Sequence, residues 1–111
     1  MTLADHNCEP CRGGIPALSP AEVAPLVAEL DGWTAVAVHH IEKEYKFRDF
    51  AAALAFVNEV GAIAEAEDHH PDIWFTWGRA KIEIRTHKID GLTRNDFILA
   101  AKIDRVGATT E

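Results

Sequence analysis

The sequence has little of what marks disordered, multidomain or membrane-spanning chains. Its 111 residues include only 5 prolines and 7 glycines, and 48% are hydrophobic, which fits one compact globular domain. No apolar run approaches the roughly 20 residues that a helix needs to cross a bilayer. The N-terminus also has no basic segment followed by an apolar one, as a secretory signal has. We therefore expect a soluble cytoplasmic protein that does not engage a membrane.

Positive charge is also scarce. Lysine and arginine number 11 against 18 aspartates and glutamates, for a formal net charge of -7. No local run of basic residues offsets this excess, so the chain repels phosphate backbones. Nucleic acid is thereby excluded as an expected direct partner. A domain this small buries only a modest core, which favours a homo-oligomer, either a dimer or a tetramer.

The chain has only two cysteines, Cys8 and Cys11. Their Cys-x-x-Cys spacing lies in a polar segment rich in Gly and Pro, and not at the start of a helix after a strand, which argues against a thioredoxin-type redox pair. A tetrahedral zinc site needs two further ligands, and only His6 is close in sequence. We expect reduced thiols in a flexible segment, although a metal shared between subunits stays open.

Hydrophobic periodicity predicts seven elements after an irregular N-terminal lead, residues 1–18. Helices are expected from an N-cap at Ser19 to about residue 30, over 49–67, and from an N-cap at Thr93 to about residue 104. Strands are expected over 33–38, 41–47, 73–77 and 79–87. The order α-β-β-α-β-β-α predicts an α+β fold, a four-stranded antiparallel sheet with helices packed on one face. One domain, 19–106, and a tail, 107–111, complete the predicted organisation.

Three histidines are the strongest candidates for chemistry. Pro71 ends the central helix, because the residue before a proline is pushed out of the α region. This places His69 and His70 at a helix-to-strand junction. His87 lies at the predicted end of the last strand, on the face that points away from the apolar layer. Histidine titrates near neutral pH and can act as either acid or base.

The spacing of these residues resembles the signature of the pterin-4a-carbinolamine dehydratase family. That signature has an acid before His-His-Pro, then an aromatic, a later histidine and a final aspartate. The matching residues here are Glu65, His69, His70, Pro71, Trp77, His87 and Asp96. Segments 45–50 and 97–104 are also similar to the family, and the resemblance extends from about Ser19 to Asp104. It implies dehydration of 4a-hydroxytetrahydropterin to quinonoid dihydropterin, in the recycling of tetrahydrobiopterin.

The resemblance implies the following roles. His69, His70 and His87 are the candidate catalytic residues: His69 and His87 are candidate general acids for the departing hydroxyl, and His70 binds the pterin and takes the other proton. Glu65 and Asp96 support the imidazoles. Pro71 and either Trp74 or Trp77 are assigned to the substrate, the indoles by stacking on its flat ring. No cofactor or metal is expected.

Each residue alone also has a plainer interpretation. The histidine doublet fits a solvated helix end, and His87 fits a surface strand position. Asp96 fits a capping box with Thr93, Glu65 a solvated helix face, and a strand tryptophan the core. Two other functions stay open: a non-catalytic binding, assembly or transcriptional cofactor module, and a metal site built from the three histidines. His39 and His40 have no counterpart in the signature and are treated as ordinary.

Overall fold

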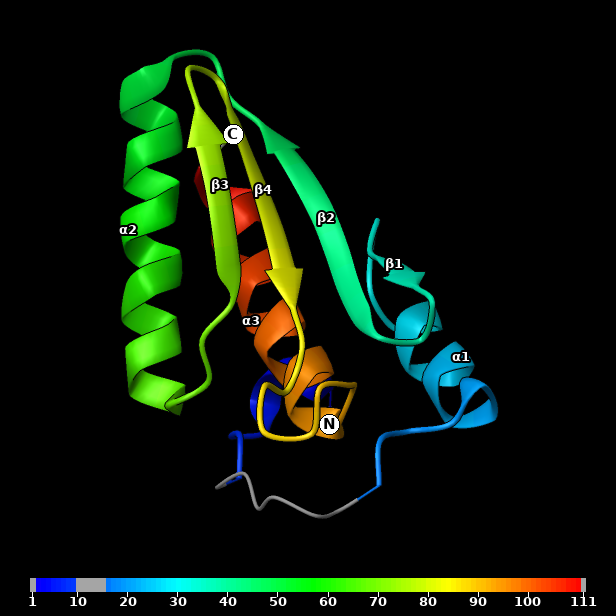
Figure 1. Ribbon diagram of the computed structural model, residues 1–111. Helices are drawn as coiled ribbons and strands as arrows, with labels where there is room; N and C mark the ends of the chain where they lie inside the picture. Colours follow the sequence, from blue (N-terminus) through cyan, green and yellow to red (C-terminus); the bar gives the residue numbers. More distant parts are fainter. Residues whose placement is uncertain (1, 10–15, 111) are drawn as a thin grey trace.

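A computed structural model describes residues 2–9 and 16–110, with side chains through residue 106. The described residues fold into three α-helices, four strands and one short 3-10 helix (Figure 1). The helices are α1 (Pro20–Ala28), α2 (Phe50–Glu67) and α3 (Arg94–Thr110), and the 3-10 helix is η1 (Leu3–Asp5). The strands are β1 (Thr34–Val36), β2 (His40–Lys46), β3 (Asp72–Thr76) and β4 (Arg79–Ile84). The predicted α+β order is confirmed.

The four strands form one antiparallel sheet in the order β1-β2-β4-β3. Two hairpins, β1–β2 and β3–β4, are joined in the middle by pairing of β2 with β4. In that central register Ile41 pairs with Ile84 and Tyr45 with Ala80. Because side chains alternate along a strand, the register sends these residues to one face and Glu42, Glu44, Lys81 and Glu83 to the other.

The core lies between the apolar face of the sheet and the helices. Fully buried side chains come from β2, β4, α2 and α3, among them Ile41, Ile82, Ile84, Phe56, Val60, Phe97 and Leu99. Helices α2 and α3 lie side by side across this face, and α1 packs near β1 (Figure 1). The opposite face carries the polar positions of β2, β3 and β4. Among the described residues, no helix combines the length and the apolar character that a bilayer span requires.

Local sequence explains where the helices begin and end. Ser19 accepts a hydrogen bond from the Glu22 amide at 3.3 Å, and the Glu22 side chain accepts one from the Ser19 amide at 2.9 Å, which closes a capping box. This bonding holds the pKa of Glu22 below its usual value. Asp49 caps α2 through the Ala52 amide, and Asp68, in the left-handed conformation, ends it.

The β3–β4 turn depends on a glycine. Gly78 has φ +74°, a conformation in which a side chain is strained. A Cβ at this position would also lie 3.0 Å from the Phe47 carbonyl oxygen. The Gly78 carbonyl also accepts a hydrogen bond from the Phe47 amide at 2.7 Å. The turn predicted near Gly78 therefore joins the hairpin to the end of β2.

Three boundaries differ from prediction. Strand β4 ends at Ile84, before His87, because a loop closed by Thr86 and Gly91 replaces further strand pairing. Helix α3 continues to Thr110, beyond the predicted end near residue 104. The predicted irregular lead contains η1, which packs against α3 and buries Leu3. The burial of Leu3 holds this short 3-10 turn against α3. A three-residue element is too short to give a hydrophobic periodicity in the sequence.

Candidate functional site

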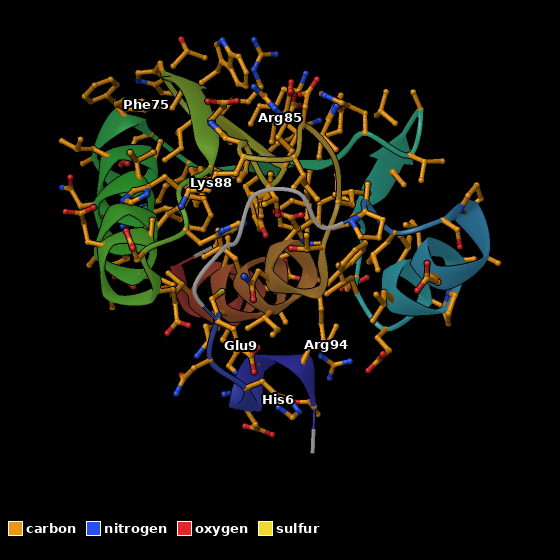
Figure 2. The ribbon with its side chains drawn as sticks, turned by 60° about the horizontal axis from the view of Figure 1, so that its bottom comes forward. His6, Glu9, Phe75, Arg85, Lys88 and Arg94 are labelled. Carbon is orange, nitrogen blue, oxygen red and sulfur yellow. The ribbon has the colours of Figure 1, made fainter. Side chains whose placement is uncertain are left out.

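All three predicted histidines line one cavity of about 260 Å³. His69 and His70 enter it from the segment between α2 and β3, and His87 enters it from the loop after β4. The remaining lining residues are Asp68, Arg85, Thr86 and Lys88. Figure 2 looks at this end of the molecule and labels Arg85 and Lys88. Segments that are distant in the sequence thus supply imidazoles to one hollow, as the histidine pattern predicts.

His69 is the buried member of the group, with 7% of its surface exposed. Its Nε2 lies 2.6 Å from Oδ1 of Asp96, which is fully buried. The other carboxylate oxygen of Asp96 accepts from the Thr86 hydroxyl at 2.9 Å and from the Thr93 amide at 2.8 Å. Three donors around one carboxylate match its ionised, acceptor-only form. His69 therefore donates from Nε2, and as a neutral ring it keeps a lone pair on Nδ1.

His70 is the more exposed neighbour, with 52% of its side chain accessible. Its Nε2 is paired with Oε2 of Glu65, one turn back on α2. The two predicted supporting acids therefore divide between the two histidines: Asp96 holds His69 and Glu65 holds His70. Glu65 is 79% exposed, so solvent screens this pair and it adds little to stability. Its effect is to restrict the orientation of the His70 ring.

His87 is exposed and lies in the loop between Thr86 and Gly91. The Thr86 amide donates to the Gly91 carbonyl at 2.8 Å, which closes the loop at its base. Gly91 permits this closure, because a Cβ there would lie 2.8 Å from the Ala17 Cβ. Thr86 also donates to Asp96, so the base of the His87 loop and the His69 partner share one hydrogen-bond network.

The predicted substrate-stacking residues lie elsewhere in the described chain. Trp74 is 53% exposed and lines a separate hollow with Phe75 and Lys81, and its ring lies under the Lys81 ammonium at 5.7 Å. Trp77 is 66% exposed at the β3–β4 turn, beyond the end of β3 that is remote from His70. That strand is roughly 13 Å long at about 3.3 Å per residue. Pro71 follows His70 but is not among the residues that line the histidine cavity.

Two side chains in the cavity were missed by sequence reasoning. Arg85 contacts Asp72 at 3.4 Å and Asp90 at 3.2 Å, and Lys88 extends from the same loop as His87. Both bring positive charge to a hollow in an acidic protein. The only signal in the sequence was their closeness to His87, which does not distinguish a cavity residue from a surface one.

Cys8 is not part of the histidine cavity. Its thiol lies 3.5 Å from the Asn95 carbonyl, and its amide donates to Glu67 at 2.7 Å. Burial, reinforced by the Glu67 charge, raises the pKa of the thiol to about 12. The sequence predicts a flexible segment here, and in the structure two hydrogen bonds attach Cys8 to α2 and α3. Cys11 lies outside the described residues.

Comparisons with known proteins point to one family. The family model described as pterin 4 alpha carbinolamine dehydratase matches residues 16–106. A Rubrobacter xylanophilus protein provisionally named pterin-4-alpha-carbinolamine dehydratase is 53% identical over 104 residues, 94% of this chain and 97% of its own length. A Rickettsia bellii protein with the same provisional name is 50% identical, over 93% of this chain and 92% of its own.

A solved structure shares the fold. It is that of a protein from Brucella melitensis named transcriptional coactivator/pterin dehydratase, and it has a TM-score of 0.79 at 30% sequence identity. The similarity covers 83% of this chain and 99% of that one. The match therefore extends over most of the domain that contains the histidine cavity.

Proposed function

The chain belongs to the pterin-4a-carbinolamine dehydratase family, and from this premise we propose that it is a hydro-lyase that removes water from 4a-hydroxytetrahydropterin. The product is the quinonoid dihydropterin, so the reaction returns a spent tetrahydrobiopterin to its recycling route in the cytoplasm. The observation that carries the proposal is that histidines from two separate segments line one cavity.

The reaction needs two proton transfers. The bond between carbon 4a and the hydroxyl oxygen breaks, and that oxygen takes a proton and leaves as water. The adjacent ring nitrogen loses its proton, so that a carbon–nitrogen double bond replaces the lost bond. A positioned acid or base contributes typically about 10²- to 10⁴-fold to such a step.

We assign these transfers by the accessibility of each imidazole. His87 is exposed at the cavity and is the main candidate acid for the departing hydroxyl. His70 is also accessible, and Glu65 orients it to bind the pterin and accept the other proton. His69 lines the cavity but is largely buried, and its Nε2 donates to Asp96. It offers only Nδ1 to the substrate, and it serves as a second acid when that nitrogen is protonated and otherwise as a positioning group.

We also propose that the protein is a homo-oligomer. Four large apolar side chains at the start of α2 and towards the end of β3 are substantially exposed, namely Phe50, Leu54, Phe75 and Trp77. Phe50 and Phe75 already contact each other, with ring centroids 5.4 Å apart. Strand β3 is also an edge of the sheet. An exposed apolar cluster beside an unpaired edge is typical of a subunit interface.

The proposed activity is tested by making the carbinolamine with a pterin-dependent hydroxylase and following its decay by absorbance. The protein should accelerate the decay, and His70→Ala and His87→Ala should each weaken the acceleration at least about tenfold. His6→Ala is the matched control, because His6 lies in the N-terminal segment and lines a different hollow (Figure 2). Decay at the uncatalysed rate with folded protein would refute the proposal.

A binding or transcriptional cofactor role is the second candidate, favoured by similarity to the Brucella melitensis protein, whose name includes transcriptional coactivator. The two roles separate by their sensitivity to mutation. If the binding role dominates, histidine substitutions leave the cellular phenotype intact, whereas changes to the exposed apolar cluster abolish it.

A further inference from the structure

The face of the sheet opposite α2 and α3 carries an unfavourable arrangement of charge. Glu42 on β2 pairs directly with Glu83 on β4, and Glu83 pairs directly with Asp72 on β3. Three carboxylates therefore form one row across three adjacent strands. Like charges directly opposite each other in a sheet are destabilising, so this row requires positive charge nearby.

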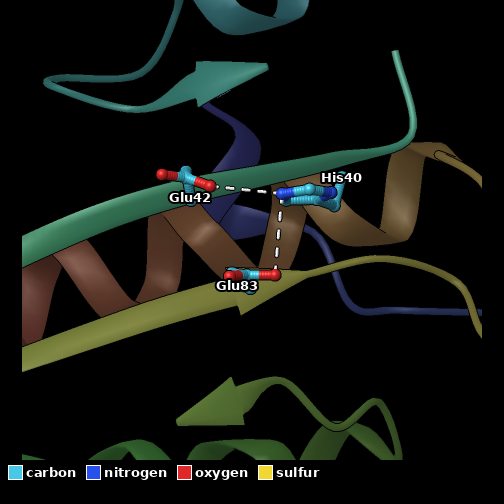
Figure 3. Close-up of side chains that lie close together, drawn as sticks. All are labelled: His40, Glu42 and Glu83. Carbon is cyan, nitrogen blue, oxygen red and sulfur yellow. Dashed lines mark hydrogen bonds and ion pairs between the residues drawn. The ribbon is translucent and has the colours of Figure 1, made fainter. Parts of the chain in front are cut away.

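An imidazole faces two of these carboxylates. His40 Nε2 lies 3.2 Å from Oε1 of Glu42 and 3.6 Å from Oε1 of Glu83 (Figure 3). One ligand atom from each of the three residues lies within 4.8 Å of the others. Ligands held tetrahedrally at about 2.1 Å from zinc lie roughly 3.4 Å from one another. The two separations from His40 Nε2 lie on either side of that value, and the third, between the two glutamates, is at most 4.8 Å.

A hydrogen-bond relay orients the His40 ring. Asp90 Oδ1 lies 2.7 Å from His39 Nε2, and the Nδ1 atoms of His39 and His40 are 3.0 Å apart. His39, through its hydrogen bond and charge, and the nearby Arg85 hold the pKa of Asp90 below its usual value, so Asp90 is an acceptor. His39 donates from Nε2 to this carboxylate, and the contact between the two Nδ1 atoms fixes the orientation of the His40 ring toward the glutamates.

In the metal-free protein His40 Nε2 lies within hydrogen-bond distance of Glu42 Oε1, and a metal ion would bind in place of the Nε2 proton. The deprotonated nitrogen would then face two carboxylate oxygens, an arrangement that a metal ion satisfies directly. A metal-bound histidine commonly donates its second ring nitrogen to an acceptor that continues to a carboxylate. The path from His40 through His39 to Asp90 has this form.

Lys81 does not fill the space between the three ligands. Its ammonium lies 3.3 Å from Oε2 of Glu83 and 3.8 Å from Oε2 of Glu42. The lysine thus engages the outer oxygens and leaves both Oε1 atoms facing His40. One lysine also compensates only one of the two glutamates, so a net negative charge remains to attract a cation.

We propose that His40, Glu42 and Glu83 bind one divalent transition-metal ion of the zinc class on the outer face of the sheet. One imidazole and two carboxylates are a ligand set that such ions accept, with water in the remaining position. The three side chains are only 18–31% exposed, so the ion would be partly shielded from solvent. The site is separate from the histidine cavity and does not depend on the proposed enzymatic function.

The bound ion would link two parts of the fold. It would bridge β2 to β4 and, through His39, reach Asp90 in the loop that also contains His87. Asp90 Oδ1 lies 3.2 Å from Nε of Arg85, which lines the histidine cavity. We therefore expect the ion to stabilise the folded chain and the base of this loop.

The first test is calorimetric titration of metal-stripped protein with Zn²⁺. We expect one ion per chain, with the affinity reduced at least tenfold in both Glu83→Gln and His40→Gln. Glu44→Gln is the matched control, because Glu44 is the next outward glutamate on β2 and is not a ligand. The double variant His70→Ala/His87→Ala should keep the ion, which distinguishes this site from the histidine cavity. Absence of binding, or binding unaffected by Glu83→Gln, would overturn the proposal.

The second test is thermal unfolding with and without Zn²⁺. A ligand that binds only the folded chain raises Tm. We expect a rise for the unsubstituted protein and for Glu44→Gln, and little or none for Glu83→Gln. Each variant is compared with its own metal-free form, so an unrelated loss of stability cancels. An equal rise in Glu83→Gln and His40→Gln would show that zinc acts elsewhere.

Discussion

His69 and Asp96 are 27 positions apart in the sequence and are joined in the protein interior by a 2.6 Å hydrogen bond. The same carboxylate accepts the Thr93 amide at the start of α3. Asp96 therefore combines two interpretations that the sequence left as alternatives, a helix-capping acid and a partner of a site histidine. Its Oδ2 serves the helix, and its Oδ1 serves the imidazole.

Replacing Asp96 tests both roles together. In Asp96→Asn the side chain has one acceptor oxygen in place of two, and its amide nitrogen cannot accept from His69 or from the cap. We expect the free energy of unfolding to fall by about 1–3 kcal/mol, the cost of leaving a buried polar group without its partner. Dehydratase activity should fall at least about tenfold, because His69 loses its fixed tautomer.

Urea denaturation and the carbinolamine assay measure these two effects. Asp31→Asn, at an exposed position before β1, makes the same chemical change and should alter neither. An Asp96→Asn variant with full stability and activity would show that the carboxylate is dispensable at both ends of its network.

Replacing Glu65, the partner of His70, should change activity more than it changes stability. Because both side chains are largely exposed, Glu65→Gln should change the free energy of unfolding by less than about 1 kcal/mol. Activity should still fall several-fold, since a neutral amide oxygen replaces the charged acceptor and orients His70 less firmly at the cavity.

Glu59→Gln is the control for this change, because Glu59 is exposed on the same helix and does not line the cavity. Kinetics and urea denaturation of the two variants should differ only in kcat/KM. If Glu65→Gln lowered stability and activity in proportion, Glu65 would instead have a structural role.

The elements were predictable from sequence because their signals are local. The apolar stripe of α2 and the proline at position 71 predicted a helix over 49–67 and the place of the histidine doublet, and the structure has α2 at Phe50–Glu67. The end of β4 was not predictable in this way. It depends on the Thr86–Gly91 closure, in which the glycine matters because of its approach to Ala17, a contact across the fold.

The partners of the histidines also required the structure. Spacing along α2 places Glu65 within reach of either member of the doublet, and only the left-handed turn at Asp68 decides that it pairs with His70. His40 was treated as ordinary because it has no counterpart in the family signature, and its neighbours depend on strand register. Glu42 and Glu83 are 41 positions apart and become adjacent only when β2 pairs with β4.

The exposed apolar cluster predicts self-association. Leu54 is 39% exposed on α2, within the cluster formed with Phe50, Phe75 and Trp77. Leu54→Glu would place a charge in that contact, and an unpaired buried charge is costly. We therefore expect the variant to shift to a smaller species in analytical ultracentrifugation.

The matched control is Trp74→Ser, which removes an exposed aromatic side chain from the other face of β3 and should leave the oligomeric state unchanged. Circular dichroism establishes that each variant is folded. A monomeric unsubstituted protein, or an oligomer indifferent to Leu54→Glu, would contradict the assignment of this surface.

The attachment of η1 to α3 should respond to acid in a defined range. Arg105 donates to Asp5 at 2.8 Å, and with the Thr2 contacts this lowers the pKa of Asp5 from 3.8 to about 2. A carboxyl whose pKa is depressed by folding stabilises the fold above its unfolded value and loses that contribution as pH falls. The loss should therefore occur between about pH 4 and pH 2.

An NMR titration should find the Asp5 midpoint near the lower limit, and Arg105→Gln should return it towards 3.8. The pKa of Glu22, lowered instead by its capping box with Ser19, should not respond to Arg105→Gln. An Asp5 midpoint that is the same with and without Arg105 would show that the guanidinium does not hold the N-terminal turn.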